Sequence, residues 1–196
     1  QAPPLLEDTY TFEDALLVGS MLITLLKHAD RVKIACMAQL VNVIAPIMAE
    51  EHGPAWRQTT FYPFAEAALH ARGQAYAPAI SSPTIHTEAY GDVPAIDAVV
   101  TWDEQARTGL LLAVNRDANT PHTLTIDLSG LPGLPGLGTL ALGKAQLLHE
   151  DDPYRTNTAE APEAVTPQPL GIAMNATGTC TATLPAISWI SVEFHG

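Results

Sequence analysis

The sequence predicts an α/β segment over residues 1–74, followed by an antiparallel β-sandwich over residues 75–196. The first segment has the order helix, strand, long loop and helix, which is found in α/β barrels and doubly wound sheets. After it come about seven or eight short strand-forming runs separated by turn signals, an arrangement typical of a sandwich. Of the 196 residues, 47% are apolar, which is enough for a packed core.

The first predicted helix runs from Thr11 to His28. Thr11 is suited to cap its N-terminus, while Glu13 and Asp14 place negative charge in the first turn. Lys27 and His28 place basic side chains in the last turn, where they complement the helix dipole. Because the middle of the helix is apolar on nearly all sides, we expect it to be buried between other elements.

The apolar run Val32–Ala38 is predicted to be a strand covered on both faces, as in a parallel sheet. A long loop leads from it to a second helix over about Pro63–Arg72, with Gly73 just past its end. Since one strand cannot form a sheet, the remaining strands are expected to lie upstream. The chain is therefore expected to be the C-terminal piece of a longer protein.

The second segment contains seven clearly predicted strands. These are Ala95–Trp102, Gly109–Asn115, His122–Asp127, Leu140–Leu148, Gly171–Met174, Cys180–Leu184 and Ser188–Phe194. The repeated Leu-Pro-Gly of residues 130–138 predicts a turn. The polar, Pro-rich stretch Asp151–Pro169 predicts a long connection across the sandwich.

Charge and cysteine content limit the partners and the compartment. The formal net charge is −12, so the chain repels phosphate backbones and anionic membrane surfaces, and we expect neither nucleic acid nor membrane as a partner. The longest apolar stretch, Ala15–Leu26, is too short to cross a bilayer, which needs about 20 residues. Cys36 and Cys180 are predicted to be buried thiols rather than a disulfide, which favours a reducing, cytoplasmic compartment.

Common signatures of catalysis and metal binding are missing. The seven histidines do not show the paired spacing of a zinc site, so we predict no metal ligand. Neither a phosphate-binding Gly-rich loop nor a nucleophile elbow is present. The pairs Glu50-Glu51 and Asp151-Asp152 lie in predicted loops, where adjacent carboxylates are typically solvated.

Gln39 is the most informative polar residue. It directly follows the predicted strand, and the C-terminal end of such a strand faces the ligand in parallel α/β architectures. Its amide can both donate to and accept from a hydroxyl-rich substrate, although it could equally serve only to tie down the loop. Asn42 is interpreted as a loop-structuring residue, and Trp56 as an anchor of the loop or a surface on which a sugar stacks.

Several stretches of the chain carry a resemblance to a known family. They are TFEDALLVG at 11–19, HADRVKIACMAQLVNVIAPI at 28–47, GPAWRQT at 53–59 and FYPF at 61–64, with looser matches at 113–116, 157–158 and 188–189. These stretches closely resemble glycoside hydrolase family 51, the α-L-arabinofuranosidases. The resemblance implies a (β/α)8 TIM barrel followed by a jelly-roll-like β-sandwich, with Val32–Ala38 as the eighth barrel strand.

The resemblance also implies a mechanism. The family retains anomeric configuration with two glutamates, an acid/base and a nucleophile, about 5 Å apart. Their Asn-Glu and Glu-Trp motifs are absent here, so we expect the catalytic residues upstream and none in this chain. Gln39 matches the family glutamine that hydrogen-bonds the arabinofuranose, and no metal or organic cofactor is implied.

The expected function is therefore that of the C-terminal part of a retaining α-L-arabinofuranosidase. With the upstream part of the same enzyme, and in a homo-oligomer, it would remove terminal arabinofuranosyl residues from arabinan or arabinoxylan oligosaccharides. Without that part, an open sheet edge and an exposed apolar face are expected.

The sequence disfavours two other functions. The first is a non-catalytic β-sandwich module that binds carbohydrate or holds an oligomer together. The isolated Trp102 and Trp189 disfavour it, because such a module carries two or three aromatic side chains at alternating strand positions. The second is an independent hydrolase that uses Glu50 and Glu51, and the loop position of these residues argues against it.

Overall fold

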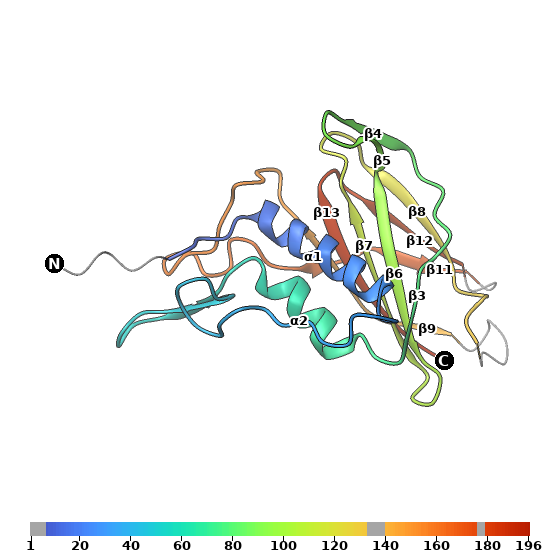
Figure 1. Cartoon of the computed structure of the whole chain (residues 1–196), viewed down its shortest axis with the longest axis horizontal. Coiled ribbons are helices and arrows are strands. Elements are labelled where there is room, and N and C mark those ends of the chain that lie inside the picture. Colours follow the sequence, from blue (N-terminus) through green and yellow to red (C-terminus); the bar gives the residue numbers. More distant parts are fainter. Residues whose placement is uncertain (1–6, 133–139, 176–178) are drawn as a thin grey trace.

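The fold consists of three layers, as seen in a computed structural model that describes residues 7–132, 140–175 and 179–196. Two helices cover one face of a six-stranded sheet, and a three-stranded sheet covers the other face (Figure 1). Most of the predicted Leu-Pro-Gly turn lies outside the described residues. Among the described residues, no helix is long and apolar enough to cross a membrane.

Both predicted helices are confirmed, with small changes at their ends. Helix α1 spans Phe12–Lys27, and Thr11 caps it through a reciprocal pair with Asp14: the Asp14 amide donates to Thr11 Oγ1 (3.3 Å), and the Thr11 amide donates to Asp14 Oδ2 (2.7 Å). Helix α2 spans Phe61–His70 and begins two residues before Pro63. Pro63 is tolerated there because the first-turn amides of a helix have no intrahelical partner.

The two stacked sheets are antiparallel throughout. The larger sheet contains, in spatial order, β10 (Gln168–Pro169), β9 (Ala141–His149), β13 (Ser188–His195), β7 (Thr108–Asn115), β6 (Ile96–Asp103) and β3 (Gln74–Tyr76). The smaller sheet contains β11 (Ile172–Met174), β12 (Thr179–Leu184) and β8 (His122–Asp127). All seven predicted strands are thus confirmed, with end points that move by one residue or not at all.

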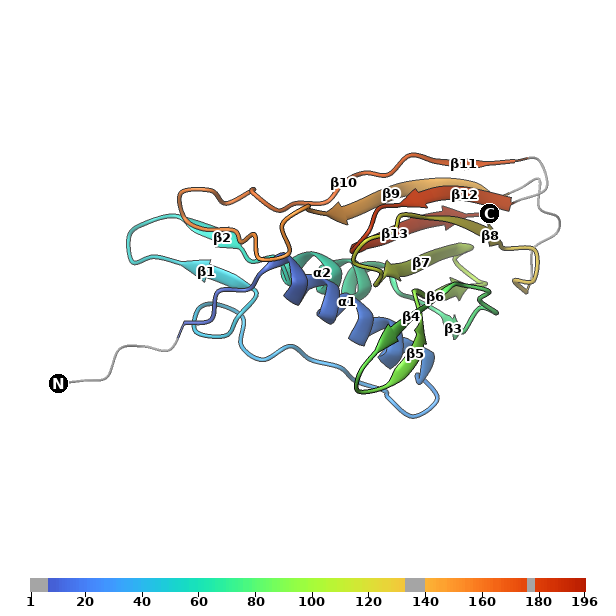
Figure 2. The same ribbon diagram turned by 90° about the horizontal axis from the view of Figure 1, so that it is seen from above.

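Two hairpins project from the layered body (Figure 2). One pairs β1 (Ile47–Ala49) with β2 (Ala55–Arg57). The other pairs β4 (Thr84–Thr87) with β5 (Gly91–Pro94). The first hairpin interrupts the long loop that the sequence predicts between residues 39 and 60.

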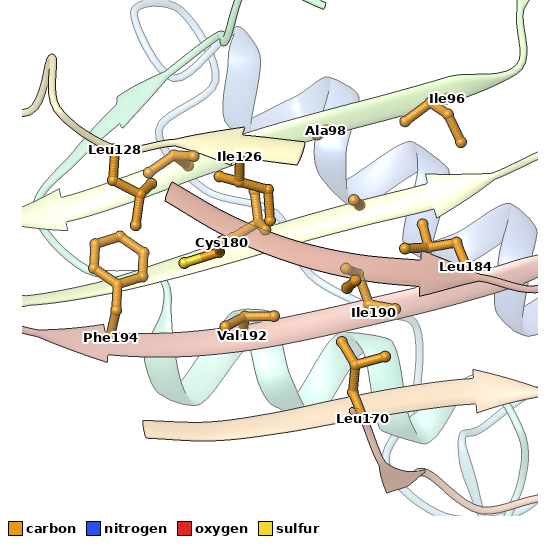
Figure 3. Packing of buried hydrophobic residues seen from close by; sticks show 14 of the residues in the cluster. Ile96, Ala98, Ile126, Leu128, Leu170, Cys180, Leu184, Ile190, Val192 and Phe194 are labelled. Carbon is orange, nitrogen blue, oxygen red and sulfur yellow. The ribbon is translucent and has the colours of Figure 1, made fainter. Parts of the chain in front are cut away.

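The central strands β6, β7 and β13 of the larger sheet are buried on both faces, and their side chains alternate between two cores. On one face, Val192 and Phe194 of β13 join the core between the sheets (Figure 3), where the Phe194 ring stacks on Trp102 at 5.7 Å. On the other face, Trp189 of β13 packs with Phe12 and Ile23 of α1. Residues on both sides of the predicted boundary at residue 74 therefore share one core, and the boundary itself stays a prediction.

Gly19 allows α1 to lie close to the sheet. A methyl group at this position would come within 2.5 Å of Trp189 Cδ1 and 2.8 Å of Nε1. The Trp189 ring is fully buried, so it has no room to move away. The distance between helix and sheet is thus set by the absence of a side chain at one residue.

The described structure differs from two predictions about the first segment. Residues 32–38 do not form a strand there, since no described strand pairs with them. Helix α1 is also not buried on all sides, since Leu17 is 58% exposed and Met21 is 54% exposed. The sheet covers only the side of the helix that carries Phe12, Ala15 and Gly19.

The turn after β7 is held by two polar side chains. The fully buried Asn115 donates from Nδ2 to the carbonyls of Thr120 (3.0 Å) and Pro185 (2.7 Å). Asp117 accepts from the amides of Asn119 (2.9 Å) and Thr120 (3.1 Å). Hydrogen bonds lower the pKa of Asp117 below its ordinary value. The bond from the Asn119 amide has the largest effect, and bonds from His122 and Thr120 add smaller ones.

This shift predicts a loss of stability in acid. A carboxyl whose folded pKa is depressed stabilises the fold above its unfolded pKa, and that contribution disappears as the pH falls through the folded pKa. We expect Asp117→Asn to lower the free energy of unfolding at neutral pH and to match the unmodified protein near pH 2. Urea unfolding between about pH 7 and pH 2 measures this difference. Glu88→Gln, at an exposed turn, is the control, and an equal deficit at both pH values would contradict the prediction.

Candidate functional site

Gln39 lies in the connecting segment, which we define as residues 32–41 between α1 and the β1–β2 hairpin. Within the described part of the chain, no backbone hydrogen bond joins residues 33–41 to another segment. Gln39 is exposed, as are the apolar Ile34 (82%) and Leu40 (71%). The Gln39 amide is therefore available to a ligand or to a neighbouring segment.

Apolar grooves run between the connecting segment and the two helices. One groove of about 180 Å³ is lined by Leu22 and Leu26 of α1, Phe64 of α2 and Ile34. A second of about 210 Å³ is lined by Val18, Met21, Cys36 and Met37, among other residues. Together with Leu17, these side chains form the apolar face, on which Leu17, Met21 and Ile34 are largely exposed.

The chain is firmly anchored just after Gln39. The side chain of Asn42 donates from Nδ2 to the Ala49 carbonyl (3.1 Å) and accepts at Oδ1 from the Ala49 amide (2.7 Å). Gln39, Asn42 and Val43 have φ values of 57°, 62° and 63°, in the left-handed region that non-glycine residues rarely adopt. The interpretation of Asn42 as a loop-structuring residue is confirmed.

Gln58 is a second anchor, which the sequence did not reveal. Its side chain is 1% exposed, accepts from the Tyr10 amide (2.9 Å), and donates to the carbonyls of Asp8 (3.0 Å) and Ala45 (2.8 Å). It thereby joins the start of the chain to the hairpin loop. In the sequence, only its position in the family-like stretch 53–59 marks Gln58 out, and that position does not indicate that the side chain is buried.

The hairpin residues do not provide acid/base chemistry. Glu50 and Glu51 are exposed at the β1–β2 turn, as predicted, and Asp151 and Asp152 are exposed as well. Trp56 is half-buried on β2 opposite Met48, as the anchoring interpretation predicts. These four carboxylates therefore lie on exposed surface and form no buried pair suited to acid/base work.

The two cysteines differ in environment. Cys180 is buried between the sheets, and this burial raises the pKa of its thiol, as expected. Cys36 is exposed, so its predicted burial is wrong. The physical reason is the same as for the missing strand, because the described residues cover only one side of the connecting segment.

A further group of polar residues lies away from Gln39. Glu66 and His70 of α2 and Glu193 of β13 place their potential ligand atoms within 4.8 Å of one another. The sequence predicts no metal ligand, whereas these three side chains have the spacing to hold a metal ion together. The available signal was the four-residue spacing of Glu66 and His70, whereas the approach of Glu193 depends on the fold.

Comparison with known proteins places these features in a family. The family model of the α-L-arabinofuranosidase C-terminal domain matches residues 1–188. The chain is 91% identical, over its whole length, to an intracellular exo-α-(1→5)-L-arabinofuranosidase of Bifidobacterium longum, of which it covers 35%. It is 50% identical over 96% of its length to a protein of the same name from Halalkalibacterium halodurans, of which it covers 36%.

A solved structure gives the same result. A family 51 α-L-arabinofuranosidase from Bifidobacterium longum superposes with a TM-score of 0.92 at 89% identity, and the match covers 98% of this chain and 36% of the other. The chain thus spans about a third of the length of the relatives it matches. The two stacked antiparallel sheets and these matches together confirm the predicted β-sandwich.

Proposed function

The chain belongs to the α-L-arabinofuranosidase C-terminal domain family, within glycoside hydrolase family 51, and we propose that it is the C-terminal part of a retaining exo-acting α-L-arabinofuranosidase. The whole enzyme would remove terminal arabinofuranosyl residues from arabinan or arabinoxylan oligosaccharides. The names of the two relatives make the α-(1→5) linkage the first to test. The observation that carries the proposal is the match over the full chain, which leaves about two thirds of each relative outside it.

The upstream part of the enzyme would cover the apolar face described above. In this proposal, residues 32–38 become the last strand of a (β/α)8 barrel once neighbouring strands are present. The exposed Ile34 and the groove between α1 and α2 support it, because a barrel strand and its flanking helices bury such side chains. The catalytic glutamates would come from the upstream strands.

Gln39 would then lie at the C-terminal rim of the barrel and hydrogen-bond the arabinofuranosyl group in its subsite. Its exposure and its place three residues before the Asn42 anchor support this role. The non-catalytic sandwich module finds no such support. Trp102 is 2% exposed and Trp189 is fully buried, so neither indole offers a platform to a sugar.

Two further features of the whole enzyme remain proposals. The word "intracellular" in the names of both relatives supports a cytoplasmic location. We also propose a homo-oligomer and a boundary near residue 74 between barrel and sandwich, where Gly73 (φ 77°) separates α2 from β3.

Hydrolysis of a chromogenic α-L-arabinofuranoside tests the proposed function. The purified chain should be inactive alone and should gain activity when refolded with the upstream polypeptide. Activity of the chain alone would contradict the proposal and return attention to Glu50 and Glu51. No activity from the complete enzyme would contradict the assigned substrate.

Thiol labelling gives a separate structural prediction. In the isolated chain, a chromogenic disulfide reagent should modify Cys36 within minutes, whereas Cys180 should react only after unfolding, because the thiolate is the reactive form. In the complete enzyme, Cys36 should be protected by the barrel, with a labelling rate lower by about 100-fold or more. Equal labelling of Cys36 in both would contradict the proposed burial of residues 32–38.

A further inference from the structure

Helix α2 and strand β13 bring three metal-ligating side chains together. Glu66 and His70 are four residues apart and so lie on one face of α2. Trp189 on the strand faces the helices, while Val192 and Phe194 face the opposite core, so the alternation of β13 directs Glu193 toward α2. His70 Nδ1 lies 3.9 Å from Glu193 Oε1.

A β-bulge lies at the position of Glu193. Val192 pairs with Ala145 and Phe194 with Leu142, so two residues of β9, Gly143 and Lys144, oppose Glu193 alone. Such bulges redirect side chains and are common beside functional sites. Gly143 leaves space at this point, since a methyl group there would lie 3.1 Å from Glu193 Cβ.

The charges at this position are incompletely balanced. The side chain of Glu66 is only 12% exposed, and that of Glu193 is 29% exposed. Lys144 is a cationic neighbour, with Nζ 3.5 Å from Glu66 Oε1 on a side chain that is 59% exposed. Two carboxylates held this close favour an additional positive charge between them.

We propose that Glu66, His70 and Glu193 form a binding site for a divalent transition-metal ion that joins α2 to β13. One imidazole and two carboxylates are a donor set suited to Zn²⁺, which binds such ligands at about 2.0–2.2 Å and takes water in its remaining position. Ligands of a tetrahedral ion at these distances lie about 3.4 Å from one another, so side-chain rotations that move the ligand atoms by up to about 1.5 Å bring the three atoms into range. Ion binding would displace Lys144 from Glu66.

The site is tested on the intact protein that contains this chain, after treatment with a chelator. Calorimetry measures the binding of Zn²⁺, and the absorption spectrum of Co²⁺ reports on binding of that ion in place of Zn²⁺. His70→Gln and Glu193→Gln should each weaken binding at this site by at least about 10- to 100-fold. Lys144→Met should strengthen it by about tenfold, because it removes a competing cation. A purely structural ion-pair cluster would not show this gain.

The exposed pair of His86 and Asp92 on the β4–β5 hairpin, 2.8 Å apart, provides the matched control. His86→Gln should leave zinc affinity and stoichiometry unchanged. Circular dichroism checks that each variant is folded. Equal zinc stoichiometry in the His70→Gln and unmodified proteins would overturn the proposal, as would a Lys144→Met variant that binds no tighter.

Discussion

Gly19→Ala is expected to lower the free energy of unfolding by about 2–3 kcal/mol, the range of severe overpacking in a close-packed core. The added methyl group would meet Trp189 Cδ1 at 2.5 Å, and the fully buried ring cannot move aside. Alanine gains about 1 kcal/mol of helix propensity over glycine, so the steric cost must exceed that gain. Denaturant unfolding of the protein measures the net effect.

A double-mutant cycle separates this contact from other effects of the substitution. Trp189→Ala removes the indole atoms that the methyl group meets, so the loss caused by Gly19→Ala should shrink by about 1 kcal/mol or more in that background. Ser20→Ala, at the next residue of α1, should change stability by less than about 0.5 kcal/mol. A stabilising Gly19→Ala substitution would show that helix and sheet are free to separate.

The second large effect is expected on activity. In the complete enzyme, Gln39→Ala should lower kcat/KM toward an arabinofuranoside by about 100-fold, or about 2.7 kcal/mol, if its amide contacts the sugar hydroxyls in the transition state. Gln39→Glu keeps an acceptor but loses the donor, so it should also be impaired. Because Gln39 is exposed and makes no described hydrogen bond, neither change should reduce the stability of this chain.

The control for this experiment is Gln105→Ala, at an exposed turn residue that the proposal does not place near the substrate. Its kcat/KM should stay within about twofold of the unmodified enzyme. If Gln39→Ala retained full activity, Gln39 would have no part in substrate binding. If it lost stability as well as activity, the alternative role in tying down the loop would be favoured.

Local patterns predicted most of the fold. The Thr11 cap, both helices and the seven strands follow from capping residues, dipole-complementary charges and turn signals, all of which act within a few residues. The hairpin at residues 47–57 was missed because its strands are three residues long. Such short runs carry too little periodicity to predict.

Contacts between distant residues could not be predicted in the same way. Nothing local distinguishes the buried Gln58 from an exposed glutamine, because its partners, Asp8, Tyr10 and Ala45, lie far from it in the chain. The same holds for the approach of Glu193 to α2. The errors at Cys36 and at residues 32–38 have a different origin: their apolar pattern implies covering elements that the described residues do not include.

The doubly buried central sheet limits how this region can be exchanged between proteins. β13 contributes alternate residues to two cores, so a cut at the end of α2 would leave Trp189 and its neighbours exposed to water. A sandwich built this way cannot be transferred as an independent module, as appended binding modules can. Recombination between related enzymes should therefore be less disruptive when α1, α2 and the larger sheet come from one parent than when the crossover falls between α2 and β3.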